Sequence, residues 1–195
     1  MPLTPFHLGS GLFLGSLTLR FFNLWAILLG SIVMDIEPAV LLIIRKCYSC
    51  PHHAFFHSIL GAIFGSLILA AILWKFREKL DNPAPWNIPF YLQKMGEIPH
   101  SKTDRVRNAF GNKGRDKISQ SFSFPVLFCS SLAAWILHIF FDNLTHYDVF
   151  LFWPFHFKPF YLGPGVYWPL NFIFLIFGIF GFLLAYKKIK TPKNL

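Results

Sequence analysis

The sequence predicts an all-α membrane protein, a polytopic bundle of about five apolar helices that forms a single domain over residues 1–195. Hydrophobic residues make up 54% of the chain and charged residues only 14%, whereas a soluble domain averages about 25% charged residues. The apolar residues also gather in runs that approach the roughly 20 residues needed to cross a bilayer. The predicted partner is therefore the lipid bilayer, and the predicted location is the cell (plasma) membrane, which the chain crosses several times.

Five apolar segments account for the predicted helices. The first runs from about residue 8 to 22 and is short for a span, and Arg20 and Asn23 mark its turn into the second, from about 24 to 44. The third runs from 55 to 76, the fourth from 122 to 141 and the fifth from 166 to 186, and each approaches the length of a span. Glycines four residues apart in the first and third segments (Gly11 and Gly15, Gly61 and Gly65) allow close helix packing.

Two irregular stretches connect the later helices. The polar stretch from Lys75 to Gln120 contains two turn-rich runs, at 82–85 and 111–114, and is predicted to form a loop with a short interfacial helix near 90–95. The stretch from Asn143 to Gly165 is rich in aromatic residues and proline, a composition typical of the membrane–water interface. We expect it to lie at one end of the bundle.

The basic residues predict which side of the membrane each loop faces. Ten of the 18 Lys and Arg residues lie between Lys75 and Lys117, and four more lie in the tail from Lys187 to Lys193. Basic clusters beside membrane helices most often mark cytoplasmic loops. Nucleic-acid binding is the alternative, but acidic residues are mixed into the same loop, so no nucleic-acid partner is predicted. The 75–120 loop and the C-terminus are therefore placed in the cytoplasm.

This topology brings the histidines to one face of the membrane. If the 75–120 loop is cytoplasmic, the third helix runs inward and the fourth runs back out. The start of the third helix, with His52, His53 and His57, then lies at the outer face. The end of the fourth, with His138, Asp142 and His146, lies there too, and His7 joins them if the first helix starts outside.

Ionisable residues inside apolar segments predict a metal site. Such groups are costly in a membrane, so they usually face the bundle interior and serve a function. His138 and Asp142 are four residues apart and share one face of a helix, as do His53 and His57. Imidazole and carboxylate are the ligands of zinc and similar divalent ions. A buried His–Asp hydrogen bond that serves only packing is the alternative for the first pair.

The second segment carries two acids, Asp35 and Glu37, just before Pro38. On an ideal helix these two side chains point about 200° apart. Both reach one site only if the proline disturbs the helix, so Asp35 is the better ligand, and Glu37 pairing with Arg45 or Lys46 is an equal alternative. Cys47 and Cys50 allow a zinc knuckle, a redox pair, a disulfide or a plain loop.

Several motifs together resemble a known family of inner-membrane proteins. They are Pro5-Phe6-His7, the run from Gly30 to Pro38, His52-His53-Ala54-Phe55-Phe56-His57-Ser58, His138-Ile-Phe-Phe-Asp142, and Phe152-Trp153-Pro154-Phe155. In this order they resemble the inner-membrane family of metal-dependent hydrolases that has a LexA-regulated bacterial member. That family is distantly similar to the zinc-dependent phospholipase C and nuclease superfamily, whose members are all-helical. Where the family motif usually has Arg and Thr, this chain has His53 and Phe56.

The resemblance implies a set of metal ligands and a reaction. The implied ligands are His7, Asp35, His52, His57, His138 and Asp142, and the implied ion is a divalent metal, foremost zinc. Such an ion activates a water molecule and polarises a phosphoryl or carbonyl oxygen, and Asp35 or Glu37 is the expected general base. The expected substrate is a phosphoester or other ester, with a lipid headgroup as one form. The alternatives are a membrane transporter or metal-handling protein without hydrolytic activity, and a haem-binding scaffold.

Overall fold

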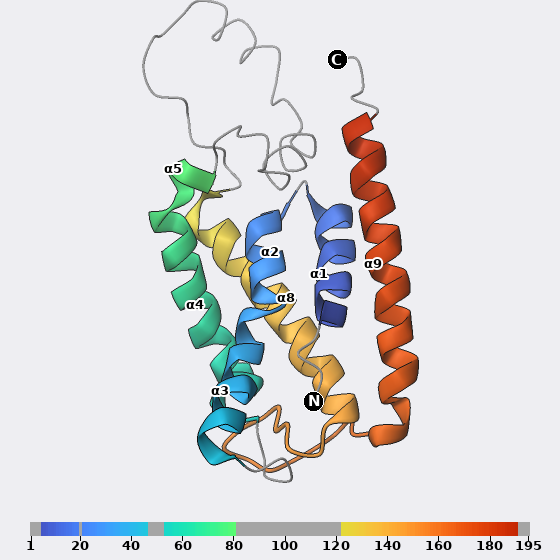
Figure 1. Ribbon diagram of the computed structural model, residues 1–195. Coiled ribbons are helices and arrows are strands. Elements are labelled where there is room, and N and C mark those ends of the chain that lie inside the picture. Colours follow the sequence, from blue (N-terminus) through green and yellow to red (C-terminus); the bar gives the residue numbers. More distant parts are fainter. Residues whose placement is uncertain (1–4, 20, 47–52, 81–121, 191–195) are drawn as a thin grey trace, which may run out of the picture.

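The computed structural model describes residues 5–19, 21–46, 53–80 and 122–190, and this part of the chain is helical without a strand (Figure 1). The predicted all-α membrane bundle is confirmed. Its helices and 3-10 turns (η) are α1 (Pro5–Thr18), α2 (Leu24–Gly30), η1 (Val33–Asp35), α3 (Ile36–Arg45), η2 (Phe55–His57), α4 (Ile59–Lys75), α5 (Arg77–Leu80), α8 (Phe124–Thr145), η4 (Pro164–Val166) and α9 (Tyr167–Lys190).

Three helical stretches are long and apolar enough to cross a membrane, namely Leu24–Arg45, Phe124–Thr145 and Pro164–Lys187. The helix Ile59–Lys75 is apolar but shorter. The first helix, α1, has 14 residues, in line with the short first segment that the sequence predicts. The described part of the chain therefore combines long spans with two shorter helices that pack among them.

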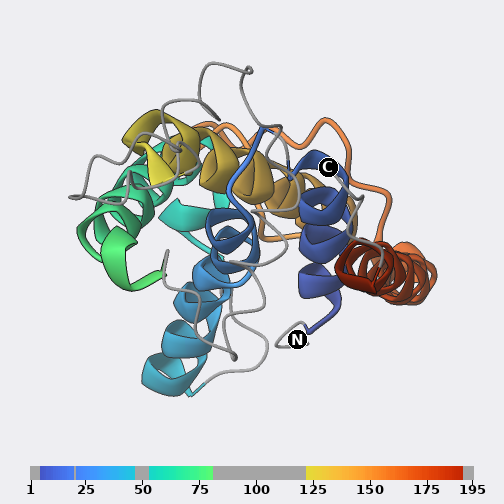
Figure 2. The same ribbon diagram turned by 90° about the horizontal axis from the view of Figure 1, so that it is seen from above.

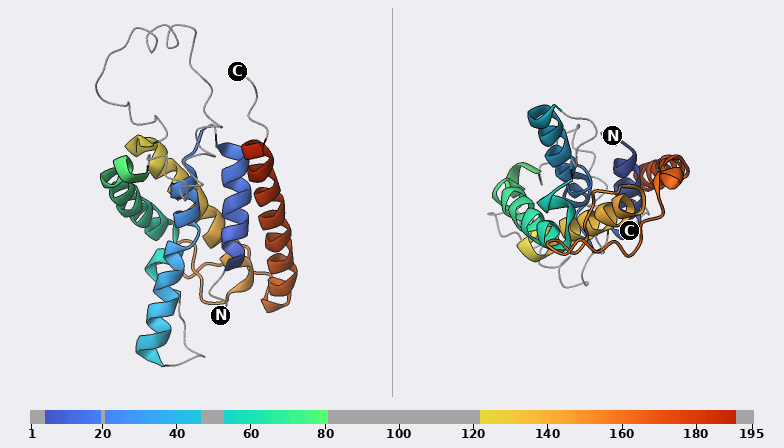
Figure 3. Two further views of the ribbon diagram at one scale, coloured as in Figure 1. Left: turned by 45° about the horizontal axis from the view of Figure 1, so that its top comes forward. Right: turned by 90° about the horizontal axis from the view of Figure 1, so that it is seen from below.

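Helix α8 is the centre of the bundle. It packs against α2 and α4, while α1 packs against α2 on one side and along α9 on the other. Viewed from above, α9 lies at the edge of the bundle beside α1 (Figure 2). Helix α3 projects from the bundle (Figure 3), and its side chains Ile43 and Ile44 are 72% and 70% exposed. An apolar residue exposed in a membrane span faces lipid, so α3 presents a large apolar surface to the bilayer.

The second apolar segment forms a candidate span, Leu24–Arg45, close to the predicted bounds of 24 to 44, but it is not one continuous α-helix. Asn23 caps α2, because its side-chain oxygen accepts a hydrogen bond from the backbone N–H of Ala26 at 3.0 Å. The helix ends at Gly30, and the chain then makes the 3-10 turn η1 before α3 begins at Ile36. Pro38 falls in the first turn of α3, where its missing N–H costs no helical hydrogen bond.

The third segment also begins differently from the prediction. Helix α4 starts at Ile59 rather than at 55, because Ser58 is its N-cap and accepts a hydrogen bond from the backbone N–H of Gly61 at 3.1 Å. His53 and His57 therefore precede the helix, and the premise that they share a helix face was wrong. His57 instead lies in the 3-10 turn η2, which is fixed to α8 by a hydrogen bond from Trp135 Nε1 to the Phe56 carbonyl at 3.0 Å.

The fourth and fifth segments form α8 and α9, both longer than predicted. Helix α8 continues past residue 141 to Thr145, and the stretch from Tyr147 to Gly163 is irregular, as its aromatic and proline content predicts. In the predicted GxxxG pair of α4, Gly65 allows the close approach of α8, since a Cβ there would collide with the indole of Trp135. The predicted interfacial helix near 90–95, Cys47, Cys50 and His52 lie outside the described residues.

Candidate metal centre

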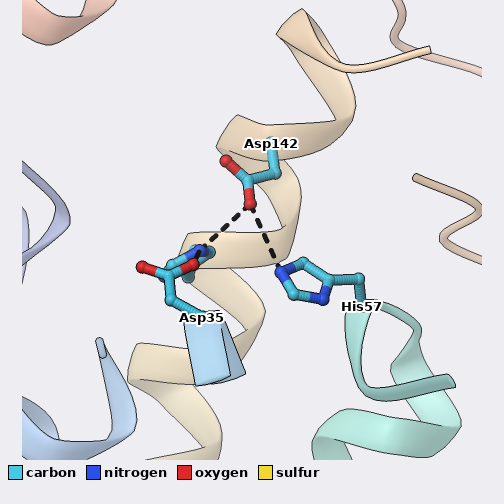
Figure 4. Close-up of side chains that lie close together, drawn as sticks. Asp35, His57 and Asp142 are labelled. Carbon is cyan, nitrogen blue, oxygen red and sulfur yellow. Dashed lines mark hydrogen bonds and ion pairs between the residues drawn. The ribbon is translucent and has the colours of Figure 1, made fainter. Parts of the chain in front are cut away.

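Five of the predicted ligands come together from four separate segments. His7 lies in the first turns of α1, Asp35 ends η1, His57 ends η2, and His138 and Asp142 lie one turn apart on α8. One ligand atom from each of Asp35, His57, His138 and Asp142 lies within 4.8 Å of the others. The carboxylates of Asp35 and Asp142 and the imidazole of His57 face one another (Figure 4).

Asp142 is the central residue of this cluster. Its Oδ2 lies 3.0 Å from Nε2 of His138 and 3.6 Å from Nε2 of His57. Its Oδ1 lies 3.1 Å from Nε2 of His7, whose ring stacks on that of His138 with centroids 3.8 Å apart. The side chain of Asp142 is buried, so its charge must be compensated by these neighbours or by a bound cation.

The tautomer of His138 follows from its partners. Its Nδ1 lies 2.8 Å from the backbone carbonyl of Ser31, which can only accept, so Nδ1 carries a proton. Its Nε2 faces two carboxylate oxygens, from Asp142 at 3.0 Å and from Asp35 at 3.2 Å. In a neutral ring this nitrogen presents a lone pair to both oxygens, an arrangement that only a proton or a metal ion makes favourable.

His57 is oriented in the same way by Glu37. Oε2 of Glu37 lies 3.0 Å from Nδ1 of His57, and the same carboxylate accepts hydrogen bonds from the backbone N–H groups of Ala54 and Phe56. Nε2 of His57 is thereby turned towards Asp142, where it is buried and has no hydrogen bond among the described residues. A carboxylate or carbonyl behind each ligating histidine is the usual outer shell of a metal site.

A cavity of about 180 Å³ adjoins the cluster. One part of its wall is polar and includes Asp35 and Asp142, and the rest is apolar, with Ala39 and Leu42 from α3 and Leu170 and Phe174 from α9 among its members. The cavity lies between α3, which projects into the lipid region, and α9 at the edge of the bundle. An amphiphilic molecule fits such a wall, with its polar group at the carboxylates.

The structure also brings in residues that lie outside the implied set of ligands. His146, the C-cap of α8, and His53 lie at the cavity, and Asp148 lies beside His53. Burial lowers the pKa of His146, which favours the neutral imidazole that binds metals. Asp148 lies in the irregular stretch after α8, where no helical periodicity identifies it as a ligand. The nearby His146 is the one signal in the sequence that could have pointed to it.

Glu37→Gln is expected to weaken metal binding by about 10- to 100-fold, the usual effect of removing an outer-shell partner. The variant keeps the size of the side chain but removes the negative charge that holds Nδ1 of His57. The affinity for Zn²⁺ can be measured by competition with a chelating dye. Glu78→Gln, the same change on an exposed residue of α5, is the control, and equal affinities of the two variants would contradict a positioning role for Glu37.

Comparison with known proteins identifies a family. A family model described as YdjM inner membrane protein matches residues 1–193. No curated protein and no solved structure matches the chain. The match covers nearly the whole chain, so it includes every segment of the candidate metal centre, and the predicted resemblance to an inner-membrane family is confirmed.

Proposed function

Since the chain belongs to the YdjM inner membrane protein family, we propose that its His/Asp cluster binds a divalent metal ion and hydrolyses a phosphoester or other ester at the membrane. The observation that carries this proposal is the environment of His138. Its Nε2 faces carboxylate oxygens of Asp35 and Asp142 at 3.2 and 3.0 Å while its Nδ1 is held by a carbonyl. A divalent ion would neutralise the charge of the two carboxylates, and the imidazole nitrogen and carboxylate oxygens present here are ligands that zinc binds.

The chain's residues divide into three roles. His57, His138 and Asp142 would hold the ion, with His7 orienting Asp142 through its second oxygen. A zinc ion bound by three protein groups lowers the pKa of a water molecule and polarises an ester oxygen. Asp35 would act as the general base, because it lines the cavity and its side chain, at 13% exposed, is more exposed than those of His7, His57, His138 and Asp142. Glu37 is committed to His57 and two backbone amides, so it is assigned as a positioning residue.

The proposed substrate is an amphiphile that enters from the bilayer. The cavity has apolar residues of α3 and α9 on the side away from the carboxylates. Ile43 lines it and is also 72% exposed within a candidate span. A molecule whose acyl chain remains among these residues would present its ester group to the cluster, so lipids with an ester or phosphoester headgroup are the substrate class.

Two measurements on purified protein test the proposal. We expect close to stoichiometric zinc, manganese or iron, together with hydrolysis of a chromogenic phosphodiester or of a short-chain lipid ester. Protein without bound metal would overturn the proposal. Bound metal without hydrolysis of either probe would instead favour the alternative function, a metal-handling protein.

Filling the cavity is expected to block an amphiphilic substrate without affecting the metal. Ala39→Trp places an indole in the cavity, whereas Val40→Trp places the same group on the exposed face of α3, where Val40 is 44% exposed. We expect Ala39→Trp to reduce hydrolysis of a lipid ester at least about 10-fold, and Val40→Trp to leave it within about 2-fold, since a bulky group excludes the substrate chain by steric overlap. Equal rates in the two variants would reject this entry route.

The proposed topology places the metal centre toward the outer face and residues 75–120 and the C-terminus in the cytoplasm. In support, α5, the start of α8 and the end of α9 lie at one end of the bundle, and η2 and the start of α1 lie towards the other (Figure 1). A cysteine placed at Glu78 in a cysteine-free background is expected to react with an impermeant maleimide in inverted vesicles. Reaction in intact cells instead would show that this loop faces outward and would overturn the proposed topology.

A further inference from the structure

A second group of candidate ligands adjoins the first. It consists of His53, His146 and Asp148, and one ligand atom from each lies within 4.8 Å of the others. The ring centroid of His53 lies 4.4 Å from that of His57 and 4.9 Å from that of His146. The two groups therefore meet at His53 and His57 and form one continuous cluster.

Asp142 faces both groups with different oxygens. Its Oδ2 is directed at His138 and His57, at 3.0 and 3.6 Å. Its Oδ1 lies 3.9 Å from Nε2 of His146 and 3.1 Å from Nε2 of His7. A carboxylate whose two oxygens face two sets of histidines has the arrangement of a bridging ligand between two metal ions.

The contact between His53 and Asp148 has the distance of a hydrogen bond but not its geometry. Nδ1 of His53 lies 2.9 Å from Oδ1 of Asp148, yet this buried nitrogen makes no hydrogen bond within the described residues. The other oxygen of Asp148 accepts a hydrogen bond from the backbone N–H of His53 at 3.1 Å, which holds the carboxylate in place. The side chains of both residues are at most 5% exposed. An imidazole nitrogen and a carboxylate oxygen that lie this close without a hydrogen bond between them are expected when both are ligands of the same metal ion.

We propose that the centre is dinuclear, with a second divalent ion held by His53, His146 and Asp148 and with Asp142 shared between the two ions. This inference rests on the proposed function, because Asp142 can be shared between two ions only if the first ion is bound. A second ion would add positive charge beside the first, which suits the charge that develops on the oxygens of a phosphoester during hydrolysis, so phosphoesters are the favoured substrate class.

The second ion is expected to bind more weakly than the first. In a bridged pair each group has one carboxylate of its own, Asp35 beside the first ion and Asp148 at the second, and each has a share of Asp142, so carboxylate charge does not distinguish the two sites. The side chain of His146, however, is 22% exposed, while those of His57 and His138 are almost fully buried. Exclusion of water therefore favours the first site, so dialysis should remove the second ion first.

Titration of metal-free, full-length protein with Zn²⁺ alone tests the proposal. We expect two ions per chain in the wild type and one in both Asp148→Asn and His146→Ala, with the tight site retained. His156→Ala is the matched control, since its ring packs on Phe150 and belongs to neither group, and it should bind two ions. Retention of the tight ion shows that each variant is folded. As a second measurement, wild-type protein loaded with Mn²⁺ should show the exchange-coupled resonance of a bridged pair.

The outcomes separate the two proposals. One ion in the wild type, unaffected by either substitution, would overturn the dinuclear centre and leave the proposed function intact. No ion in the wild type would overturn both. Two ions that persist in Asp148→Asn and His146→Ala, or two uncoupled Mn²⁺ ions, would place the second ion elsewhere and overturn the bridge.

Discussion

Asp142→Asn is expected to abolish metal binding and to lower the hydrolysis of a chromogenic phosphodiester by at least about 10³-fold. Asp142 contacts three of the cluster's histidines within 3.6 Å and is the carboxylate that the others surround. Asparagine has the same shape but lacks the charge that attracts a cation. A bound metal contributes several kcal/mol to transition-state stabilisation, and each 1.4 kcal/mol, roughly, is a factor of ten in rate.

Metal content per chain, measured by mass spectrometry on protein purified with and without added zinc, is the primary measurement. Glu78→Gln on α5 is the matched control, because it removes one carboxylate charge far from the cluster in sequence and on an exposed helix. A circular dichroism spectrum that matches the wild type shows that the variant is folded. Asp142→Asn protein with the wild-type metal content would contradict the central role of this carboxylate.

The positions of the ligands along the chain could be predicted because their signal is local. A histidine or acid in an apolar run stands out from composition alone, and His138 and Asp142 share a face by helix geometry. The convergence of segments could also be anticipated, since the alternation of spans brings the start of α4 and the end of α8 to the same end of the bundle. The structure describes that arrangement (Figure 1).

Helix boundaries were harder to predict because a capping residue can start or end a helix inside a segment that is apolar throughout. Apolar residues continue on both sides of Ser31 and on both sides of His57-Ser58, so hydrophobicity alone does not show that the α-helix is interrupted at either place. Ser58 is a favoured N-cap residue, and it was the one local sign that α4 begins at Ile59. The break before α3 has a similar consequence, because it leaves the Ser31 carbonyl available to hold His138.

The outer partners of the ligands could not be predicted, since they depend on contacts between distant segments. Ser31 and His138 are 107 residues apart, Glu37 and His57 are 20 apart, and His53 and Asp148 are 95 apart. No periodicity within one helix relates such positions. Glu37 illustrates the consequence, because from sequence it was a poorer ligand than Asp35 and a candidate general base, with pairing to Arg45 or Lys46 as an equal alternative. Its contacts with His57 and two backbone amides now favour a positioning role.

Removal of the metal is expected to lower the stability of the protein by about 4 kcal/mol when the ion is present at about 1,000 times its dissociation constant. The cluster joins α1, η1, η2 and α8 through His7, Asp35, His57 and Asp142. Without a cation, the buried carboxylate of Asp142, the partly buried carboxylate of Asp35 and the lone pairs of the imidazoles face one another, and the segments that carry them lose a common partner. For a chain of this size the loss corresponds to a melting temperature lower by about 8–16 °C.

Thermal unfolding in detergent, with and without a chelator, measures this effect, and Asp142→Asn separates it from other actions of the chelator. If an ion in the cluster stabilises the protein, the chelator should lower the melting temperature of the wild type only, since the variant has no ion to lose. Re-addition of Zn²⁺ should restore the wild-type melting temperature and leave the variant unchanged. If the chelator lowers the melting temperature of both proteins equally, the stabilising ion lies outside the cluster. If the melting temperature of neither protein changes, the buried His/Asp network is stable without a metal ion and is held together by protons shared between the imidazoles and carboxylates.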